Sequence, residues 1–296
     1  MTLEQIREYA SLYNLPQPLS YKELPRATSG NTSYIIDTPD KQYVIRTLIR
    51  QSIDSANDEH TIQVLLENAG ITTPLYIKSV NGNMAETIND TSIVVSELVP
   101  GSRQQHDTIE LAKDMGATLA KIHDTLLTTH ISFNGQQWFN PRNTELQLEK
   151  YVGPDKHFIS EMTAKYSKIL DENLPLAVTH GDFHTNNIFS ANDKVTAVFD
   201  FESAEYTVRI LDIARLYLTY IKVTDLEPEE VIQAIIAGYN SAAEFGLTEL
   251  EESKLEDAFI YVALVSSVSI YNHGNLISSS KYLNIAKDYI LSQENK

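Results

Sequence analysis

The chain has 296 residues, of which 42% are hydrophobic and 21% are charged, as is ordinary for a soluble globular protein. It has no cysteine, which excludes a disulfide framework and any thiolate metal or nucleophile site. Its formal charge of −17, from 23 basic and 40 acidic residues, opposes binding to nucleic acid and anionic membranes, and no basic patch offsets it. The polar N-terminus lacks a signal-peptide core, and no run approaches the ~20 apolar residues of a membrane span. We therefore expect a cytoplasmic protein with no nucleic-acid partner and no membrane partner.

The first third of the chain is rich in β-formers. Residues 31–37 and 42–48 predict two strands, and Thr-Pro-Asp-Lys between them predicts a hairpin turn. Apolar positions at helical spacing predict a helix over 55–68. Two more short β runs follow, at 75–80 and 92–98. The second leads into Pro100-Gly101, which is the best boundary signal in the chain.

The rest of the chain is mostly helical in its periodicity. A compact β segment at 177–201 interrupts the pattern. The predicted fold is α+β, with a β-rich N-terminal lobe over 1–99 that includes a hinge, and a mostly helical C-terminal lobe over 100–296. The helical stretches are expected at 108–128, in parts of 146–170, and at 228–245, 250–271 and 281–293.

Two histidines stand four residues apart in the stretch HGDFHTNNIF, at 180–189. On a helix, His180 and His184 would share one face, as in zinc hydrolases. Gly181 and the β-leaning residues 177–179 favour a strand and a loop here instead. A metal hydrolase therefore stays only as a third alternative.

A second carboxylate follows in VTAVFDFE, at 195–202, where alternation predicts a short strand that ends at Asp200. Asn187 lies five residues after Asp182. One carboxylate can orient and deprotonate an attacking hydroxyl, while the other, with the amide oxygen, offers the hard oxygen ligands that Mg²⁺ takes. This is the division of labour in protein-kinase-type phosphoryl transfer.

These motifs resemble those of the aminoglycoside phosphotransferase and choline kinase superfamily, the small-molecule relatives of protein kinases. The likeness lies in H-G-D-x-x-x-x-N followed by D-F-E, in the helix-like run at 119–123, in DFESAEYTVRILDIARL at 200–216 and in the segment 237–251. It implies a bilobal protein-kinase-like fold with Asp182 as the catalytic residue and Asn187 and Asp200 as Mg²⁺ ligands. His180 and Asp212 would brace the catalytic loop, although Asp212 also suits a helix N-terminus.

The same resemblance assigns the nucleotide to the N-terminal lobe. It implies that a hairpin covers the phosphates and that a buried ion pair holds a cation against them. The hinge would present backbone groups to adenine. The implied nucleotide-binding residues are Ser29, Gly30 and Asn31 in the hairpin, Arg46 and its partner Glu59, and Ser96, Glu97 and Leu98 in the hinge.

Each of these N-terminal assignments has a plainer alternative. Residues 29–32 contain one glycine and could be an ordinary turn. Arg46 shares a strand face with Val44 and Leu48, which suits a position facing a cleft, but an ordinary strand arginine could instead reach solvent. Glu59 has rivals in neighbouring carboxylates of the same helix, and the hinge could be a buried edge strand.

The leading hypothesis is an ATP- and Mg²⁺-dependent O-phosphotransferase that acts on a small-molecule hydroxyl. The D-F-E motif and Arg209 favour a cationic amino alcohol such as choline or ethanolamine, and an aminoglycoside is a further candidate. One alternative is a homoserine or other small-metabolite kinase of the same fold. Another is a non-catalytic nucleotide-binding protein on a kinase scaffold. The acceptor, the oligomeric state and the use of GTP stay open.

Overall fold

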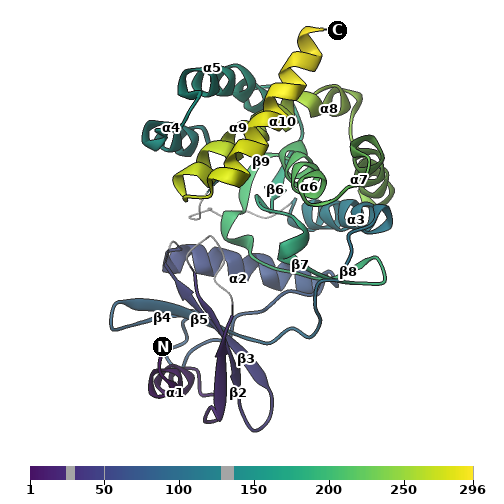
Figure 1. The fold of residues 1–296 in the computed structure, drawn as a ribbon. Coiled ribbons are helices and arrows are strands. Elements are labelled where there is room, and N and C mark those ends of the chain that lie inside the picture. Colours follow the sequence, from purple (N-terminus) through teal and green to yellow (C-terminus); the bar gives the residue numbers. More distant parts are fainter. Residues whose placement is uncertain (25–30, 50, 128–136, 296) are drawn as a thin grey trace. The chain divides into compact units, whose positions relative to one another are not determined.

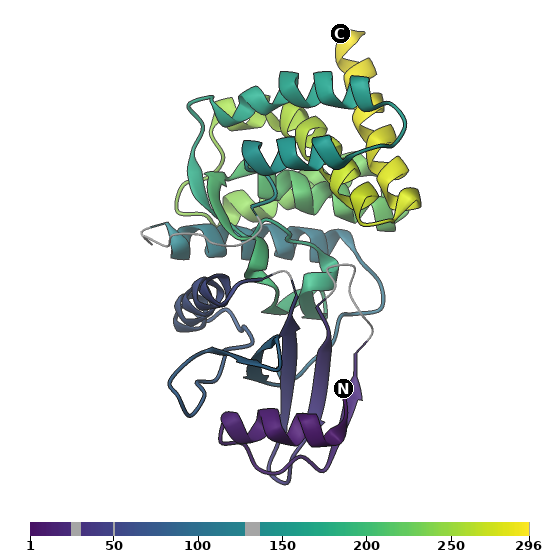
Figure 2. The same ribbon diagram turned by 90° about the vertical axis from the view of Figure 1, so that its left-hand side faces the viewer.

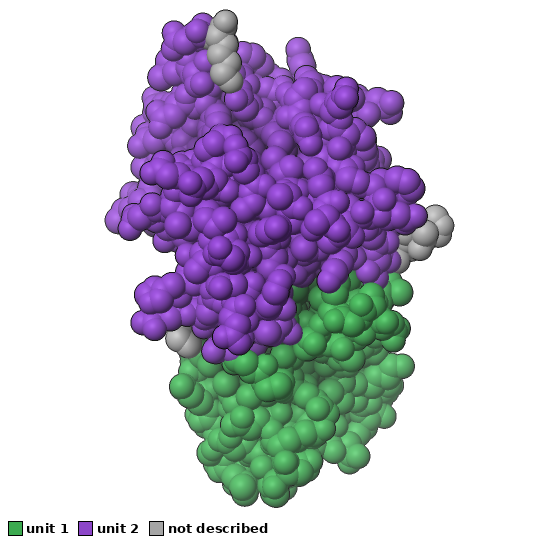
Figure 3. All heavy atoms as spheres, turned by 90° about the vertical axis from the view of Figure 1, so that its right-hand side faces the viewer, with its two compact units in different colours: residues 1–101, 130–136, 197–202 green, residues 102–129, 137–196, 203–296 purple. Residues whose placement is uncertain are grey.

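The computed structural model describes residues 1–24, 31–49, 51–127 and 137–295. Contacts between Cα atoms divide the chain into two compact units (Figure 3). Unit 1 holds residues 1–101 and 197–202, and unit 2 holds residues 102–129, 137–196 and 203–296, apart from the residues left out above. The short segment 197–202 is therefore grouped with residues that lie a hundred positions earlier in the chain.

Unit 1 is built on one antiparallel sheet, with a helix at the start of the chain and another after the third strand (Figure 1). Its elements are α1 (Leu3–Leu12), β1 (Ser20–Glu23), β2 (Ser33–Asp37), β3 (Gln42–Leu48), α2 (Ile53–Asn68), β4 (Ala85–Ile88) and β5 (Thr91–Glu97). The strand order is β1-β2-β3-β5-β4, so β3 is central. Arg46 of β3 lies opposite Ser33 of β2 and Val94 of β5.

The two faces of this sheet bury different residues because side chains alternate along a strand. On one face, Ile45 of β3 and Val95 of β5 pack with Ile6 and Tyr9 of α1. Figure 2 shows α1 lying along this face of the strands. On the other face, Leu48 packs with Ala56 of α2. Arg46 alternates with Ile45 and so lies on the α2 face, as the sequence predicted.

Unit 2 is mostly helical, with short paired strands. Its elements are α3 (Ile109–Leu126), α4 (Pro141–Lys150), α5 (Lys156–Tyr166), the 3₁₀ turn η1 (Ser167–Leu170), β6 (Leu176–Thr179), the 3₁₀ turn η2 (Thr185–Asn187), β7 (Ile188–Ala191), β8 (Lys194–Val198), the 3₁₀ turn η3 (Phe201–Ser203), β9 (Glu205–Val208), α6 (Ile210–Val223), α7 (Pro228–Ala242), α8 (Glu249–Ser253), α9 (Leu255–Asn272) and α10 (Leu276–Glu294). The last residues of β8 and most of η3 fall in unit 1. β6 pairs with β9 and β7 pairs with β8.

Helix α9 forms the centre of the helical core, and its residues from Ala258 to Ser269 are all buried. Helices α3 and α7 approach closely because α7 carries a glycine at their contact. A Cβ atom on Gly238 would stand 1.8 Å from the backbone oxygen of Lys113 in α3. The buried residues Leu211, Ile213 and Leu216 anchor α6 in the same core. These helices supply the rigid frame that holds the loop before β7.

The strongly periodic elements agree with the sequence-based expectations. β3 spans the predicted residues, and α2, α3 and α7 lie within two or three residues of the predicted bounds where they are described. Residues 75–80 were predicted as a strand, but they form only an isolated bridge at Tyr76. α1, β1, β4 and β9 were not predicted, and α6 was anticipated only as the helix N-terminus weighed for Asp212. Within the described residues, no helix is both long and apolar enough to cross a membrane.

Candidate active site

Arg46 is the centre of a buried polar cluster in unit 1. Its Nη2 atom donates to Glu59 Oε2 at 2.5 Å and to Gln51 Oε1 at 2.9 Å, and it also contacts the Tyr76 hydroxyl. Glu59 lies on α2 and its side chain is 1% exposed. Burial alone would raise the pKa of Glu59, but the Arg46 guanidinium holds that pKa below its usual value. Glu59 is therefore an ionised carboxylate with its charge matched by Arg46.

The same pair holds the D-F-E segment. Arg46 Nη1 lies 3.3 Å from Asp200 Oδ1, and the Phe201 amide N–H donates to Glu59 Oε1 at 3.3 Å. Asp200 has a φ of 68°, in the left-handed region that non-glycine residues seldom occupy. Backbone strain of this kind persists only where neighbouring contacts over-determine it, and it gathers at functional sites. The contacts of Arg46 and Glu59 supply that constraint.

The predicted phosphate-covering hairpin is only partly described. Ser29 and Gly30 lie outside the described residues. Asn31 is buried, and its side-chain nitrogen donates to Glu202 Oε2 at 2.9 Å, while its side-chain oxygen accepts from the Ile49 amide at 2.9 Å. Asn31 thus links the start of β2, the end of β3 and the D-F-E segment. Its side chain has a connecting role that the sequence did not suggest.

The hinge residues alternate in the direction of their backbone groups. The Leu98 amide N–H donates to the Gln42 carbonyl at 3.1 Å, so this donor already belongs to the sheet. The Val95 carbonyl, by contrast, accepts from the Ile77 amide at 2.7 Å on the side away from β3. By the same alternation, the backbone groups of Glu97 point away from β3. Its side chain pairs with Lys41. Ser96 is buried and lies opposite Val44 of β3.

In unit 2, Asp212 holds the backbone of the loop before β7. Its Oδ2 atom accepts from the His180 amide at 2.6 Å, and its Oδ1 atom accepts from the Gly181 amide at 2.9 Å. His123 of α3 adds a contact from Nε2 to Oδ2 at 3.1 Å, and its Nδ1 atom contacts the Tyr239 hydroxyl at 2.9 Å. Asp212 is fully buried in the first turn of α6, so its position is fixed by the helical core. Asp212 thus contacts the loop backbone from a place in the first turn of a helix.

Gly181 allows the loop to pass closely over Ser203. Its φ is 77°, and a Cβ atom there would lie 2.1 Å from the Ser203 backbone oxygen. No other residue fits both the conformation and the space. The chain therefore turns sharply from buried β6 and places Asp182 directly after this turn.

Asp182 is paired with a cation that the sequence did not single out. Nε and Nη2 of Arg215 both donate to Asp182 Oδ1, at 2.9 and 2.7 Å. Asn187 Nδ2 donates to the Asp182 carbonyl at 2.9 Å, which closes the loop. Burial alone would raise the pKa of Asp182, but Arg215 and then His184 hold it well below its usual range. Asp182 is therefore ionised at neutral pH, with a side chain that is 24% exposed.

The two histidines act within the loop and do not share a helix face. His180 is fully buried, and its Nδ1 atom accepts from the Asp182 amide at 3.3 Å. His184 Nδ1 accepts from the Asn186 amide at 3.1 Å, and its Nε2 atom lies 3.4 Å from Asp182 Oδ2. No cluster of three or more His, Cys, Asp or Glu side chains suited to a metal occurs among the described residues. The alternative of a zinc hydrolase gains no support from this geometry.

Oxygen donors of the kind that Mg²⁺ takes are present. The Asn187 amide nitrogen is turned to Asp182, which leaves its amide oxygen for a cation. Asp200 adds a carboxylate, of which one oxygen lies 3.3 Å from Arg46. Mg²⁺ sites of phosphoryl-transfer enzymes use one or two protein groups of this chemistry and complete the coordination with phosphates and water. Each of the two side chains therefore has the donor chemistry of a ligand for the predicted ion.

Arg209, which was weighed in the sequence for the acceptor, has a structural explanation. Arg209 is buried and forms a two-pronged ion pair with Glu251, with Nε–Oε1 and Nη2–Oε2 distances of 2.7 and 2.8 Å. Glu251 also caps its own helix through Thr248, so it belongs to the structural core. Arg209 therefore joins α6 to α8.

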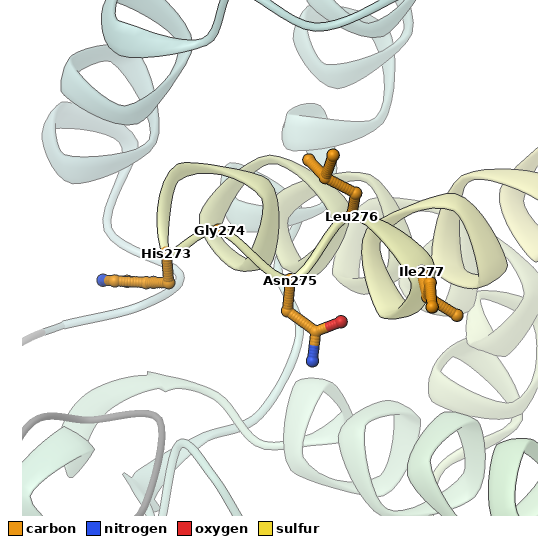
Figure 4. Close-up of a pocket in the computed structure, with 5 residues that line it drawn as sticks. All are labelled: His273, Gly274, Asn275, Leu276 and Ile277. Carbon is orange, nitrogen blue, oxygen red and sulfur yellow. The ribbon is translucent and has the colours of Figure 1, made fainter.

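A shallow hollow lies at the turn between α9 and α10. It is lined by His273, Gly274, Asn275, Leu276 and Ile277 (Figure 4). The Trp138 ring meets the His273 ring edge-on at 6.4 Å between centroids. Trp138 also donates from Nε1 to the Ser203 hydroxyl at 2.5 Å, beside Gly181. Trp138 thus contacts both His273, which lines the hollow, and Ser203.

A buried carboxyl group, Glu205, gives this region a pH dependence. Burial and then the charge of Asp212 raise its pKa to about 8, although the Phe139 amide N–H, 2.8 Å from Oε1, opposes the shift. The folded state favours the neutral carboxyl group of Glu205. Its contribution to stability is complete below the ordinary pKa of 4.5 and is lost as the pH rises from there through about 8.

We expect Glu205→Gln to raise the melting temperature above pH 8 and to leave it unchanged or lower in acid. Thermal unfolding over a pH series, with Glu145→Gln of exposed α4 as the control, measures this. Equal shifts at every pH would contradict it.

Arg215, His123 and Glu205 are the main site residues that sequence reasoning missed. Arg215 stands three residues after Asp212 on α6, so it occupies the same helix face, which was a usable signal. His123 and Glu205 gave no such signal, because their partners are far away in the sequence.

Comparison with known proteins places the chain in a family. Residues 21–252 match the model of a family described as the phosphotransferase enzyme family. A homoserine kinase of Janthinobacterium sp. (strain Marseille) is 21% identical over 258 residues, covering 84% of this chain and 80% of that protein.

Solved structures with the same fold include two small-molecule kinases. The amicoumacin kinase hAmiN, in complex with AMP-PNP, Ca²⁺ and Ami, has a TM-score of 0.81 at 19% identity and covers 97% of this chain and 92% of its own. A microcompartment-associated aminopropanol kinase has a TM-score of 0.75 at 16% identity and covers 97% and 95%.

The predicted fold class, a protein-kinase-like fold with a β-rich N-terminal part and a helical C-terminal part, is confirmed by these neighbours. The fold and the family match define a small-molecule kinase, as the sequence predicted. The family match spans most of the chain, and the protein belongs to the phosphotransferase enzyme family.

Proposed function

We propose that the protein transfers the γ-phosphoryl group of ATP to a hydroxyl group of a small molecule, with Mg²⁺ as the metal ion. One observation carries this proposal. The loop before β7 presents an ionised, partly exposed Asp182 whose side chain is held by Arg215 of α6, while Asp212 of α6 holds the amide of the preceding Gly181. A fixed carboxylate of this kind suits the orientation of an attacking hydroxyl.

In this proposal, Asp182 orients the acceptor hydroxyl and accepts its proton as the oxygen attacks the γ-phosphorus. Arg46 contacts the phosphates of ATP with the guanidinium that Glu59 holds in place. Asn187 and Asp200 hold Mg²⁺, which neutralises charge on the phosphates when it is bound. The Asp212 carboxylate keeps the loop backbone in register. Such a site works mainly by positioning and by charge stabilisation.

The neighbours' ligands support ATP as the phosphoryl donor. The amicoumacin kinase structure contains an ATP analogue and a divalent cation. In this chain, the backbone groups of Glu97 that point away from β3 would serve adenine better than the Leu98 amide, because that amide is already bonded to Gln42.

For the acceptor, we propose a hydroxylated amine. The relatives' names support it, because homoserine and aminopropanol each carry a hydroxyl and an amine. They differ in the carboxylate that homoserine adds. The net charge of −17 agrees with a cationic substrate but does not discriminate between them.

A coupled assay of ADP release tests the proposed function. Purified protein with Mg-ATP is offered 1-amino-2-propanol, homoserine, choline, ethanolamine and an aminoglycoside, and the phosphorylated product is identified by mass spectrometry. We expect turnover with at least one amine and loss of turnover when a chelator removes the metal. ATP binding without turnover on any acceptor would instead favour the non-catalytic alternative.

A further inference from the structure

We propose that Arg215 is a positioning residue, which fixes the Asp182 carboxylate so that Oδ2 is the oxygen that meets the acceptor hydroxyl. This inference rests on the proposed function, because it gives Asp182 the role of orienting that hydroxyl. It adds a residue that the comparison with kinases did not supply and names the oxygen that takes part.

The contacts of the two carboxylate oxygens are unequal. Nε and Nη2 of Arg215 both donate to Oδ1, at 2.9 and 2.7 Å, and so occupy the acceptor sites of that oxygen. Among the residues that the structure describes, the contacts of Oδ2 are long, to His184 Nε2 at 3.4 Å and to Asn187 Nδ2 at 3.5 Å. These distances lie at or beyond the outer limit of a good hydrogen bond. Oδ2 therefore keeps the capacity to accept from a hydroxyl.

The carboxylate of Asp182 needs a contact that fixes its orientation. Its last torsion is broad and roughly two-fold, so a free carboxylate would exchange its oxygens and change its plane. The Asn187 and His184 contacts are too long to prevent this. Two charged donors from one guanidinium converge on Oδ1 and fix its position, and a fixed Oδ1 also fixes the torsion that sets the plane of the group.

Arg215 is itself held from two further helices. Its Nη1 atom donates to the Ser266 hydroxyl of α9 at 2.8 Å and lies 3.4 Å from the Tyr282 hydroxyl of α10. The guanidinium carbon also lies 5.7 Å from the Tyr282 ring centroid. The side chain is 13% exposed. Helices α6, α9 and α10 therefore fix the guanidinium, and through it they fix Asp182.

Lysine cannot replace these contacts, because an ammonium is a point charge without a planar pair of donors. Arg215→Lys keeps the positive charge and removes the fork, while Arg215→Met removes both. The control is Lys222→Met. Lys222 lies on the same helix, and its Nζ atom contacts the Tyr282 hydroxyl at 3.1 Å, but no contact joins it to Asp182.

The test is a comparison of these variants in steady-state transfer to the acceptor found by the ADP-release screen. For Arg215→Met, we expect kcat to fall on the order of 10²-fold, as for a misplaced catalytic group, and Arg215→Lys to fall by less. The ATP affinity of Arg215→Lys, measured by calorimetry, and its melting temperature should stay near those of the wild type. The kcat, ATP affinity and melting temperature of Lys222→Met should also stay near those of the wild type. Millimolar methylguanidine should restore part of the kcat of Arg215→Ala, which a purely structural role would not allow.

Unchanged kcat in folded Arg215→Lys and Arg215→Met would overturn the positioning role while the proposed function stands. Loss of kcat that follows loss of folding, without rescue by methylguanidine, would also overturn it. If Arg215→Met does not fold, Arg215→Lys decides the question alone. Absence of transfer in the wild type would remove the proposed function itself, and this inference with it.

Discussion

Asp182→Asn is expected to lose phosphoryl transfer while it still binds ATP. The amide keeps the shape of the side chain but has no basic oxygen, and removal of such a group costs roughly 10²- to 10⁴-fold in rate. The residues assigned to the nucleotide, Arg46 and Glu59, lie in the other unit and pair with each other. Steady-state transfer measures the loss, and calorimetry with a non-hydrolysable ATP analogue measures the retained binding.

The control for Asp182→Asn is Asp193→Asn, which removes a carboxylate from the β7–β8 turn. Asp193 contacts Gln104 and Thr108 and no residue assigned to catalysis. Its kcat should match the wild type. Transfer at the wild-type rate by Asp182→Asn would remove Asp182 from the chemistry.

Gly181→Ala should destabilise the protein strongly and disturb the catalytic loop. A left-handed backbone costs an ordinary residue about 1–2 kcal/mol, and overpacking in a fixed site costs about 1–3 kcal/mol more. Here the added Cβ would stand 2.1 Å from the Ser203 backbone oxygen, and Ser203 is buried, so neither side can move freely. Chemical denaturation measures the free energy of unfolding.

Gly274→Ala is the matched control for this change. Gly274 has a φ of 83°, close to that of Gly181, but nothing lies within 4 Å of an added Cβ. Gly274→Ala should therefore lower the free energy of unfolding only by the cost of the left-handed backbone, about 1–2 kcal/mol. If Gly181→Ala costs no more than Gly274→Ala, the close approach to Ser203 is not the constraint on this loop.

The sequence predicted the fold well where periodicity is strong. β3 alternates between a core face and the face that carries Arg46, and this alternation is visible in QYVIRTL. β1 and β4 were missed because each has only four residues, too few for a pattern. Only the first turn of α6 was anticipated, through the helix N-terminus that suits Asp212, and the rest of this helix was not predicted.

The site was predictable to the extent that its residues form local motifs. Asp182, Asn187 and Asp200 stand at fixed offsets in two short stretches, so their types and spacing could be read directly. The partners of Asp182 and Asp212 come from α6 and α3, at sequence separations that no local pattern encodes. The direction of the hinge amides depends on which residues of β5 bond to β3, and this register follows from the whole sheet.

One turn of α6 determines how the loop before β7 is held. Asp212 and Arg215 occupy that turn and between them hold the amides of residues 180 and 181 and the carboxylate of residue 182. Three consecutive residues of the loop before β7 are thereby bonded to one helix, so we expect this part of the loop to move together with α6. Ser266 of α9 and Tyr282 of α10 both contact Arg215, so the position of the Asp182 carboxylate depends on three helices through one guanidinium.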